Sequence, residues 1–248
     1  MYLRLKEKMK EIIKDNDIKD TIVEIKTKVL TPEEAIGNPI DDDYPLLKGK
    51  ERLLQADFLG SKGVAFTDMY GNHKGTLYEI IDMELKNNFR RAIFISTINA
   101  VLKHLKLIDR TEHCRDNAMI NCAKRLPEYI KERHKNRRIF QVGFQPRFVD
   151  ILSRNFELRV TDLDKANIGR TINNIEIEPS EKSVDIIKWC DIIFATGSTF
   201  VNNTYKEFID MGKPAHQFIG GGGKPIIFYG VTCAGPAYLL DLERYCNQ

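Results

Sequence analysis

The stretch RIFQVGFQPRFVDILSRNFELRVTDLD, residues 138–164, decides the fold class. A strand-like run ends at Gly143, a helical pattern covers residues 145–155, and a second strand-like run ends in Asp162 and Asp164. A strand, a helix and a further strand in this order are typical of a parallel βαβ unit. The stretch therefore predicts a parallel sheet with helices on its faces.

The chain after this stretch repeats the alternation of strands and helices. The run Ile192, Ile193, Phe194 and Ala195 is continuously apolar, as in strands that are covered on both faces. Strands are predicted over 190–196, 215–221 and 225–230, and helices over 180–189, 204–212 and 235–246. The second half is therefore predicted to be a Rossmann-like α/β domain with a parallel sheet.

The first half has a different pattern, which predicts a smaller α+β domain. A helix is expected over 2–14, an alternating strand over 21–30, and a further strand that starts at residue 62 and ends in a glycine-rich turn. The strongest helix covers residues 85–108. One continuous apolar stripe supports it, made of Phe89, Ala92, Ile95, Ile98, Leu102 and Leu105.

The boundary between the two predicted domains lies near residue 110. We expect domains over 1–110 and 111–248, linked by a helix over 114–134 in which Pro127 marks a break or a restart. Asn99 lies inside the apolar stripe of the first domain's core helix. A buried amide without partners costs a few kcal/mol, so Asn99 must bond either to a neighbouring loop or to a ligand.

Composition excludes several classes of protein. The net charge of +3 comes from 38 basic and 35 acidic residues that are interleaved along the 248-residue chain, which argues against a nucleic-acid partner. No run approaches the roughly 18 apolar residues that a membrane span needs. The five cysteines are odd in number and form no C-x-x-C pair, which favours reduced thiols in the cytoplasm.

Polar loops follow three of the predicted strands of the second half. They contain Gly143 and Gln145, then Asp162 and Asp164, and then Thr196, Gly197, Ser198 and Thr199. Ligands of such sheets bind beyond the carboxyl ends of the strands. Asp162 follows Gly143 by 19 residues, the spacing at which a dinucleotide-binding unit carries its ribose-binding acid.

The first of these loops does not fit a dinucleotide. It lacks G-x-G-x-x-G and carries the bulky Phe144 and the ring of Pro146, so its backbone cannot close on a pyrophosphate. NAD and NADP are therefore not expected as cofactors. Asp162 and Asp164 would instead bind a hydroxyl or an amine of another ligand, or simply end the strand.

The stretch TGSTFVNN, residues 196–203, is predicted to be a long loop. Thr204 and Glu207 have the spacing of a capping box, which places the start of the next helix near Tyr205. The loop has more donors than a turn requires, so a ligand role and a structural role are both open. The donors are the hydroxyls of Thr196, Ser198 and Thr199 and the amides of Asn202 and Asn203. A glycine run, Gly220, Gly221, Gly222 and Gly223, precedes Lys224 and is either an anion-binding nest or a plain turn.

Several of these motifs resemble one family. TGSTFVNNT (196–204), VTDLD (160–164), VGF (142–144), RRAIFISTINAVL (90–102) and GVAFTD (63–68) are similar to bacterial and archaeal proteins classed as heavy-metal chelation domains. The resemblance implies an enolase-like N-terminal domain, a Rossmann-like C-terminal domain, and a site in the cleft between them. It implies ligand contacts at Thr196, Gly197, Ser198, Thr199 and Asn202, and it places Asn99 in a family-typical I-N-A motif. The family's usual G-P-S loop is replaced here by the glycine run.

Metal binding is not visible in the residue pattern itself. His113, Cys114 and Cys122 are soft ligands, but no pair has the spacing of a helical or knuckle site. A metal ion would either arrive bound to a small chelator or be held weakly by Asp162 or Asp164 together with groups of a bound molecule. The expected partner is a small molecule, either for an enzyme or metal-handling protein or for a non-catalytic sensor or carrier, and a homo-oligomer stays open.

Overall fold

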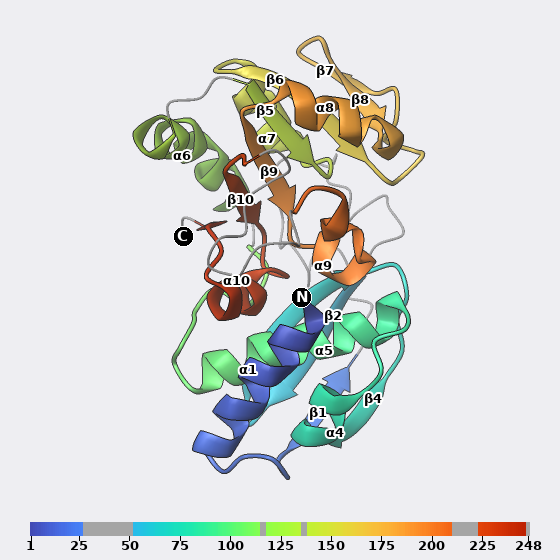
Figure 1. Ribbon diagram of the computed structural model, residues 1–248, viewed down its shortest axis with the longest axis vertical. Helices are drawn as coiled ribbons and strands as arrows, with labels where there is room; N and C mark the ends of the chain where they lie inside the picture. Colours follow the sequence, from blue (N-terminus) through green and yellow to red (C-terminus); the bar gives the residue numbers. More distant parts are fainter. Residues whose placement is uncertain (27–51, 115–117, 135–137, 210–222, 247–248) are drawn as a thin grey trace.

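The protein contains two sheets, one in each half of the chain (Figure 1). The computed structural model describes residues 1–26, 52–114, 118–134, 138–209 and 223–246. Part of the predicted strand over 21–30 and the whole predicted strand over 215–221 lie outside these residues. The mixture of one antiparallel and one largely parallel sheet confirms the predicted α/β class.

The first half is an antiparallel sheet with helices packed on it. Its strands are β1 (Ile22–Lys26), β2 (Arg52–Phe58), β3 (Ser61–Thr67) and β4 (His73–Thr76), in the order β3-β2-β1-β4. Its helices are α1 (Tyr2–Asp15), α4 (Leu77–Asp82) and α5 (Asn88–His104). The predicted core helix is therefore present as α5, with ends a few residues inside the predicted range. The enolase-like character of this half stays a prediction.

The second half is a sheet of seven strands in the order β11-β10-β9-β5-β6-β8-β7. The strands are β5 (Arg138–Val142), β6 (Glu157–Asp162), β7 (Thr171–Ile172), β8 (Ile175–Pro179), β9 (Ile192–Thr196), β10 (Ile226–Tyr229) and β11 (Arg244–Tyr245). The helices are α6 (Ala118–Arg133), α7 (Pro146–Ser153), α8 (Ser183–Trp189), α9 (Thr199–Asn202) and α10 (Ala234–Leu240), with 3-10 turns η1 (Ser180–Lys182) and η2 (Thr204–Glu207). Every neighbouring pair is parallel except β7 with β8.

The strand order of this sheet is that of a Rossmann fold. When the short hairpin strand β7 is set aside, the remaining six strands follow the order third, second, first, fourth, fifth, sixth along the chain. The order reverses between β5 and β9. After β5 the chain adds β6 and β8 on one side of β5, and it then returns to add β9, β10 and β11 on the other side. The βαβ pattern of residues 138–164 thus identified the core of the sheet correctly.

Two local predictions were wrong, and one element was not predicted. Pro127 lies inside the single helix α6 and does not break it, because Cys122, Leu126 and Ile130 bury one face of this helix against the sheet. The predicted last helix ends at Leu240, where Asp241 takes a left-handed φ of 54°, and a strand follows it. The β7–β8 hairpin was missed.

Helix α5 is the layer between the two halves. It is buried on all sides from Arg91 to Leu102. On one side it packs on β3, where a Cβ at Gly63 would lie 2.3 Å from the backbone nitrogen of Ala100. On the other side it packs on α10, where a Cβ at Gly235 would lie 2.4 Å from Cγ2 of Ile98. The close approach to backbone atoms at Gly63 and to buried side-chain atoms at Gly235 leaves no room for a Cβ at either position.

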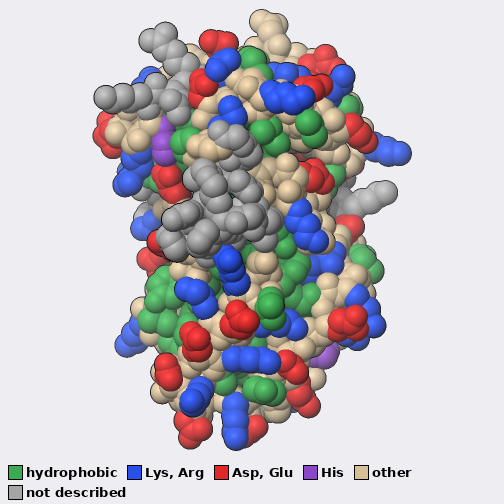
Figure 2. All heavy atoms as spheres, viewed as in Figure 1, with side chains coloured by type: hydrophobic (Ala, Val, Ile, Leu, Met, Phe, Trp, Pro, Cys, Tyr) green, Lys and Arg blue, Asp and Glu red, His purple; other side chains and the backbone are tan. Residues whose placement is uncertain are grey.

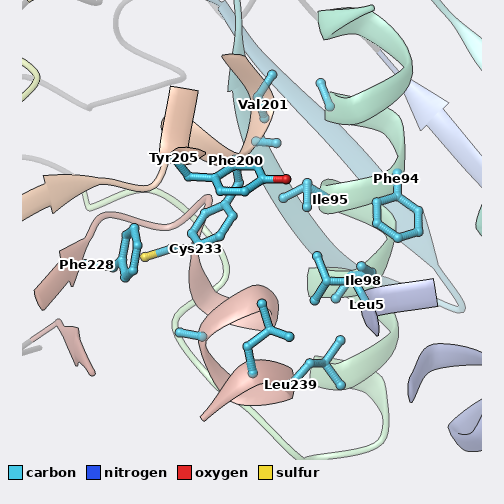
Figure 3. Packing of buried hydrophobic residues seen from close by; sticks show 14 of the residues in the cluster. Leu5, Phe94, Ile95, Ile98, Phe200, Val201, Tyr205, Phe228, Cys233 and Leu239 are labelled. Atoms are coloured by element: carbon cyan, nitrogen blue, oxygen red, sulfur yellow. The ribbon is translucent and has the colours of Figure 1, made fainter. Parts of the chain in front are cut away.

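One apolar cluster continues through this layer from the first half into the second. It includes Leu5 of α1, most of α5, and Phe200, Phe228 and Leu239 of the second half. Figure 3 shows Phe200 and Tyr205 beside Ile95 of α5. The rings of Phe200 and Tyr205 stack at 5.9 Å, and Phe228 lies 4.9 Å from Phe200. The two halves therefore share a core.

The surface carries charges of both signs. On the face that Figure 2 shows, Lys and Arg side chains alternate with Asp and Glu over both halves, as the interleaved sequence leads one to expect. None of the helices in the described part of the chain is long and apolar enough to cross a membrane.

Asn99 forms hydrogen bonds across the layer between the halves. Its Nδ2 donates to the carbonyl oxygens of Val64 (2.9 Å) and Val231 (3.2 Å), and its Oδ1 accepts from the backbone N–H of Gly235 (2.7 Å). The buried amide is thus bonded, as its burial requires, and its partners are backbone atoms of β3 and of the segment before and in α10.

We predict that Asn99→Leu lowers the free energy of unfolding by about 3–5 kcal/mol, because the buried carbonyl of Val64 and the N–H of Gly235 lose the partner that Asn99 provides, and the carbonyl of Val231 keeps only the N–H of Ala234. Thr97→Val is the matched control on the same helix. Thr97 is also fully buried, but its hydroxyl has no hydrogen-bond partner, so its loss should change stability by less than about 1 kcal/mol. Urea unfolding of both variants measures the difference. Equal losses would contradict the role given to Asn99.

Candidate functional site

The candidate site lies at the carboxyl ends of β5 and β9, where the strand order reverses. In open parallel sheets this is the place where neighbouring loops diverge and leave a crevice. The first half packs close to this edge of the sheet, since the N–H of Phe66 in β3 donates to Oγ1 of Thr232, just beyond β10 (3.1 Å). Figure 1 shows β9 pointing toward α9 and the first half. The edge therefore lies beside the junction of the two halves.

Gly143 fixes the turn after β5. Its φ is +90°, and a Cβ on it would lie 2.7 Å from Cγ2 of Thr196, so only glycine fits. Its N–H donates to the carbonyl of Thr161 (2.8 Å), while its own carbonyl accepts from the hydroxyl of Tyr229 (2.8 Å) and Nε2 of Gln141 (3.0 Å). Groups from β5, β6 and β10 thus hold this turn against the end of β9.

Gly197 fixes the turn after β9 in a similar way. Its N–H donates to the carbonyl of Tyr229 (2.8 Å), which continues the pairing of β9 with β10. A Cβ on Gly197 would lie 2.5 Å from the backbone nitrogen of Cys233, which precedes α10. Gly143, Thr196 and Gly197 are therefore brought together, as the position of their loops in the sequence predicts.

The eight-residue loop predicted over 196–203 is wrong. Helix α9 begins at Thr199, only three residues after β9 ends, and the hydroxyl of Thr199 donates to the carbonyl of Thr196 (2.8 Å). Phe200 and Val201 pull this turn of helix into the core. The expected helix near Tyr205 is only the 3-10 turn η2, because Asn203 has a left-handed φ of 64° and separates it from α9.

The predicted hydroxyl and amide groups of this stretch differ in their surroundings. Ser198 is 6% exposed, and its Oγ lies 3.4 Å from Oγ1 of Thr196. Thr199 is bonded within the turn. Asn202 is half-buried at the other end of α9, and Oδ1 of the following Asn203 is buried without a hydrogen-bond partner. Thr196 and Ser198 are thus the hydroxyls that accompany Gly143 and Gly197 at this edge of the sheet.

The carboxylate of Asp162 forms hydrogen bonds with the loop after β5 and with the loop after β6. One of its carboxylate oxygens accepts from the N–H of Phe144 (2.6 Å), and the other accepts from the N–H of Asp164 (2.7 Å) and from Nδ2 of Asn167 (3.3 Å). Asp164 is half-buried and accepts from the N–H of Ala166 (3.0 Å). Asp162, which has the sequence spacing of a ribose-binding acid, therefore accepts a hydrogen bond from the backbone of the loop after β5.

The side-chain amide of Gln145 has one hydrogen-bonded atom and one atom without a hydrogen-bond partner. Its Oε1 caps α7 by accepting from the N–H of Phe148 (2.7 Å), while its Nε2 is buried without a hydrogen-bond partner. Oε1 of Gln141, in the adjacent strand, is also buried without a partner. A buried donor and a buried acceptor in this state favour an additional bound molecule, either water or ligand.

Asn99 does not offer a free group to this edge of the sheet. The amide of Asn99 is fully buried and bonded to the backbone. Gly220, Gly221 and Gly222 lie outside the described residues. Lys224, proposed as the counter-charge of the glycine run, lies before the amino end of β10, at the opposite edge of the sheet from Thr196. Its Nζ donates to the carbonyl of Cys190 (2.5 Å).

The thiols and imidazoles do not form a metal centre in the described part of the chain, where no group of three or more His, Cys, Asp or Glu side chains converges. Burial raises the pKa of Cys190 and of Cys233 to about 11, so both thiols are protonated at neutral pH. Burial also lowers the pKa of His113, whose Nδ1 donates to the carbonyl of Cys114 (2.6 Å). These donors do not fit a resident metal ion.

Sequence reasoning missed two residues that shape the site. Tyr229 supplies the hydroxyl that holds Gly143, and Gln141 supplies an amide to the same carbonyl. The signal for Gln141 was present, since it is the one polar residue inside the apolar run of β5. Tyr229 ends an apolar strand at the carboxyl edge, where its hydroxyl is the only polar side-chain atom of that strand.

Comparison with known proteins supports both the fold and the family resemblance. Residues 128–247 match the DUF364 family model, described as "Putative heavy-metal chelation". The chain resembles a DUF364 protein of unknown function from Pyrococcus horikoshii, with a TM-score of 0.58 and 20% identity over 94% of this chain and 80% of that chain. A DUF364 protein of unknown function from Desulfitobacterium hafniense DCB-2 gives a TM-score of 0.50 and 10% identity over 77% and 72%. No curated protein matches.

We predict that Gly143→Ala lowers the free energy of unfolding by about 2–4 kcal/mol, because the new methyl group adds a clash with Thr196 to the strain of a positive φ. Gly169→Ala is the matched control. Gly169 has a similar φ of +81° with no atom near its missing Cβ, so its substitution should cost only about 1–2 kcal/mol. Denaturant unfolding compares the two, and equal losses would show that Thr196 can move away.

Proposed function

From the match of residues 128–247 to the heavy-metal chelation family, we propose that the protein binds a small anionic or metal-chelating molecule at the crevice between β5 and β9. The observation that carries the proposal is the close approach of the two loops at the strand-order reversal, where Gly143 contacts Thr196. The first half packs beside this edge, so the ligand would lie in the cleft between the two halves.

The polar groups around the crevice favour an oxygen-rich ligand. Nε2 of Gln145 is a buried donor with no protein partner, and it lies at the N-terminus of α7. Ser198 adds a hydroxyl that is engaged only at 3.4 Å. N–H and O–H donors near a helix N-terminus stabilise carboxylate or phosphate oxygens. A ligand with several carboxylates meets this requirement and also chelates metals.

A metal ion would be cargo, carried by the ligand. The carboxylate of Asp162 already accepts from two backbone N–H groups, and the two most buried thiols are protonated. Soft metals need thiolates or imidazoles that converge, and the described part of the chain does not bring three of them together. The small molecule would therefore supply most of the ligands of the metal, with Asp164 as the remaining protein carboxylate.

Binding without catalysis is favoured over a nucleotide-dependent enzyme. Asp162 has the position of an acid that binds a ribose, but its carboxylate accepts from the N–H groups of Phe144 and Asp164. The side chain of Phe144 is buried in the loop. Ser198 lies next to a threonine hydroxyl, whereas a nucleophilic serine is activated by a base. We therefore propose a carrier or sensor of a metabolite or metal chelate.

We predict that Ser198→Ala weakens ligand binding about 10-fold to 100-fold, the usual effect of losing a hydrogen bond to a charged group, while the melting temperature falls by less than about 3 °C. The probes are citrate, zinc citrate, inorganic phosphate and NAD, measured by calorimetry. Ser61→Ala is the matched control, since Ser61 starts β3 at the far hairpin of the first half. Native mass spectrometry of the purified protein identifies any ligand that co-purifies.

Three results would contradict the proposal. In the first, Ser198→Ala binds the probes as tightly as the wild type does. In the second, NAD is the probe that saturates, which would support a nucleotide-dependent enzyme. In the third, no probe binds and no ligand co-purifies, which would leave the loops as structural turns.

We predict that removal of metal leaves the fold intact. Protein treated with EDTA and dialysed should melt within about 1 °C of untreated protein, because a structural zinc site needs about four converging ligands. Elemental analysis before and after the treatment gives the metal content. One equivalent of zinc whose removal lowers the melting temperature by several degrees would mean that distant Cys and His residues do converge.

A further inference from the structure

Two residues of the first half bond to the end of α9. The hydroxyl of Tyr2, at the start of α1, donates to the carbonyl of Phe200 (2.5 Å), and Nε of Arg91 in α5 donates to the carbonyl of Val201 (2.5 Å). Both acceptors lie in the last turn of a four-residue helix. The last carbonyls of a helix have no partner within the helix, so these two donors satisfy groups that would otherwise be buried unpaired.

Arg91 is itself held firmly. It is 9% exposed, its NH1 donates to the carbonyl of Leu85 (3.0 Å), and its NH2 donates to Oδ1 of Asn88. The planar guanidinium thus spans α9 and the segment that leads into α5, which a lysine ammonium could not do with the same geometry. Tyr2 is held by an edge-to-face contact with Tyr205 at 5.6 Å, and burial raises its pKa well above the usual range, so its hydroxyl stays a donor.

A helix of one turn is not stable alone, because nucleation costs more than its few hydrogen bonds return. In α9 the N–H groups of Val201 and Asn202 both bond to the carbonyl of Ser198, and the N–H of Phe200 bonds to that of Gly197. The carbonyl groups of Gly197 and Ser198, which lie at the proposed crevice, therefore accept the first hydrogen bonds of α9. Whatever holds α9 in place also orients the Gly197–Ser198 turn.

We propose that Tyr2 and Arg91 are positioning residues of the crevice, which hold the Gly197–Ser198 turn in its binding geometry from the other half of the protein. Their effect on a ligand rests on the proposed function, but their effect on the turn does not. Because a ligand at the turn and the contact between the halves stabilise the same short helix, each should strengthen the other by the same factor.

The first test needs no ligand. In Tyr2→Phe, amide hydrogen exchange of Phe200, Val201 and Asn202 should accelerate about five-fold, the factor expected from one lost hydrogen bond, while the amides of β5 keep their rates. Tyr78→Phe is the matched control, since Tyr78 is an exposed tyrosine of the first half. Exchange in α9 that is unchanged, or that rises equally throughout the protein, overturns the proposal.

Arg91 gives an independent variant. Arg91→Lys keeps the positive charge and one donor group. The amide exchange rates of α9 in this variant should therefore lie between those of the wild type and those of Arg91→Met. Arg90→Lys is the control, because Arg90 makes an exposed bond to the carbonyl of Glu84 (3.3 Å). Amide chemical shifts of Gly197 and Ser198 should move in both Arg91 variants and stay fixed in the control. Equal exchange rates in Arg91→Lys and Arg91→Met would mean that the guanidinium does not position α9.

The second test uses zinc citrate as the probe. Its affinity should fall in Tyr2→Phe by about the factor by which exchange in α9 rises, with Ser198 left intact. Faster exchange with an unchanged affinity overturns the role of the two residues in binding. If zinc citrate does not bind the wild type, the proposed function fails for this probe, and the exchange and chemical-shift measurements still decide whether Tyr2 and Arg91 position the turn.

Discussion

The amide of Asn99 is the constraint on which the arrangement of the two halves depends. Helix α5 approaches β3 at Gly63 and α10 at Gly235 so closely that no side chain fits at either position. At this depth water is excluded, so the backbone groups facing the helix need a protein partner, and the donor and acceptor of Asn99 supply it on both sides. A rotation of one half against the other would break these bonds and open the shared apolar core at the same time. The halves therefore pack through one continuous apolar core, which the hydrogen bonds of Asn99 cross.

This constraint also limits how the first half can move beside the proposed crevice. Because the first half cannot shift freely, Tyr2 and Arg91 remain opposite the end of α9. Most polar groups near the crevice bond to one another, as Asp162 does to the loop after β5. Nε2 of Gln145 and Oε1 of Gln141, near the turn after β5, are buried without hydrogen-bond partners and so carry more information about a ligand. Both residues flank the turn after β5, beside which we propose that a ligand binds.

The parallel sheet could be predicted from the sequence because its strands are continuous apolar runs between polar turns, and burial on both faces leaves that pattern. The β7–β8 hairpin was missed although Asn173 and Asn174, both with positive φ, form the kind of two-residue turn that joins such strands. The error at residues 196–203 has a different cause. Local signals favoured a capping box at Thr204, whereas the burial of Phe200 and Val201 against α5 decided that the helix starts earlier. The partners of Asn99 are more than 30 residues away in sequence on both sides, so no local pattern reveals them.

A Rossmann strand order does not by itself imply a nucleotide, and the loop after β5 shows why. In a dinucleotide-binding unit, small residues let the backbone reach a pyrophosphate, and an acid on the next strand is left for the ribose. Here Phe144 fills the loop and its N–H bonds to Asp162, so the acid and the loop satisfy each other. The same sheet edge then offers hydroxyl and amide side chains, from Ser198 and Gln145, in place of a glycine-rich backbone. Side-chain donors of this kind are the reason why we propose a compact oxygen-rich molecule in place of an extended dinucleotide.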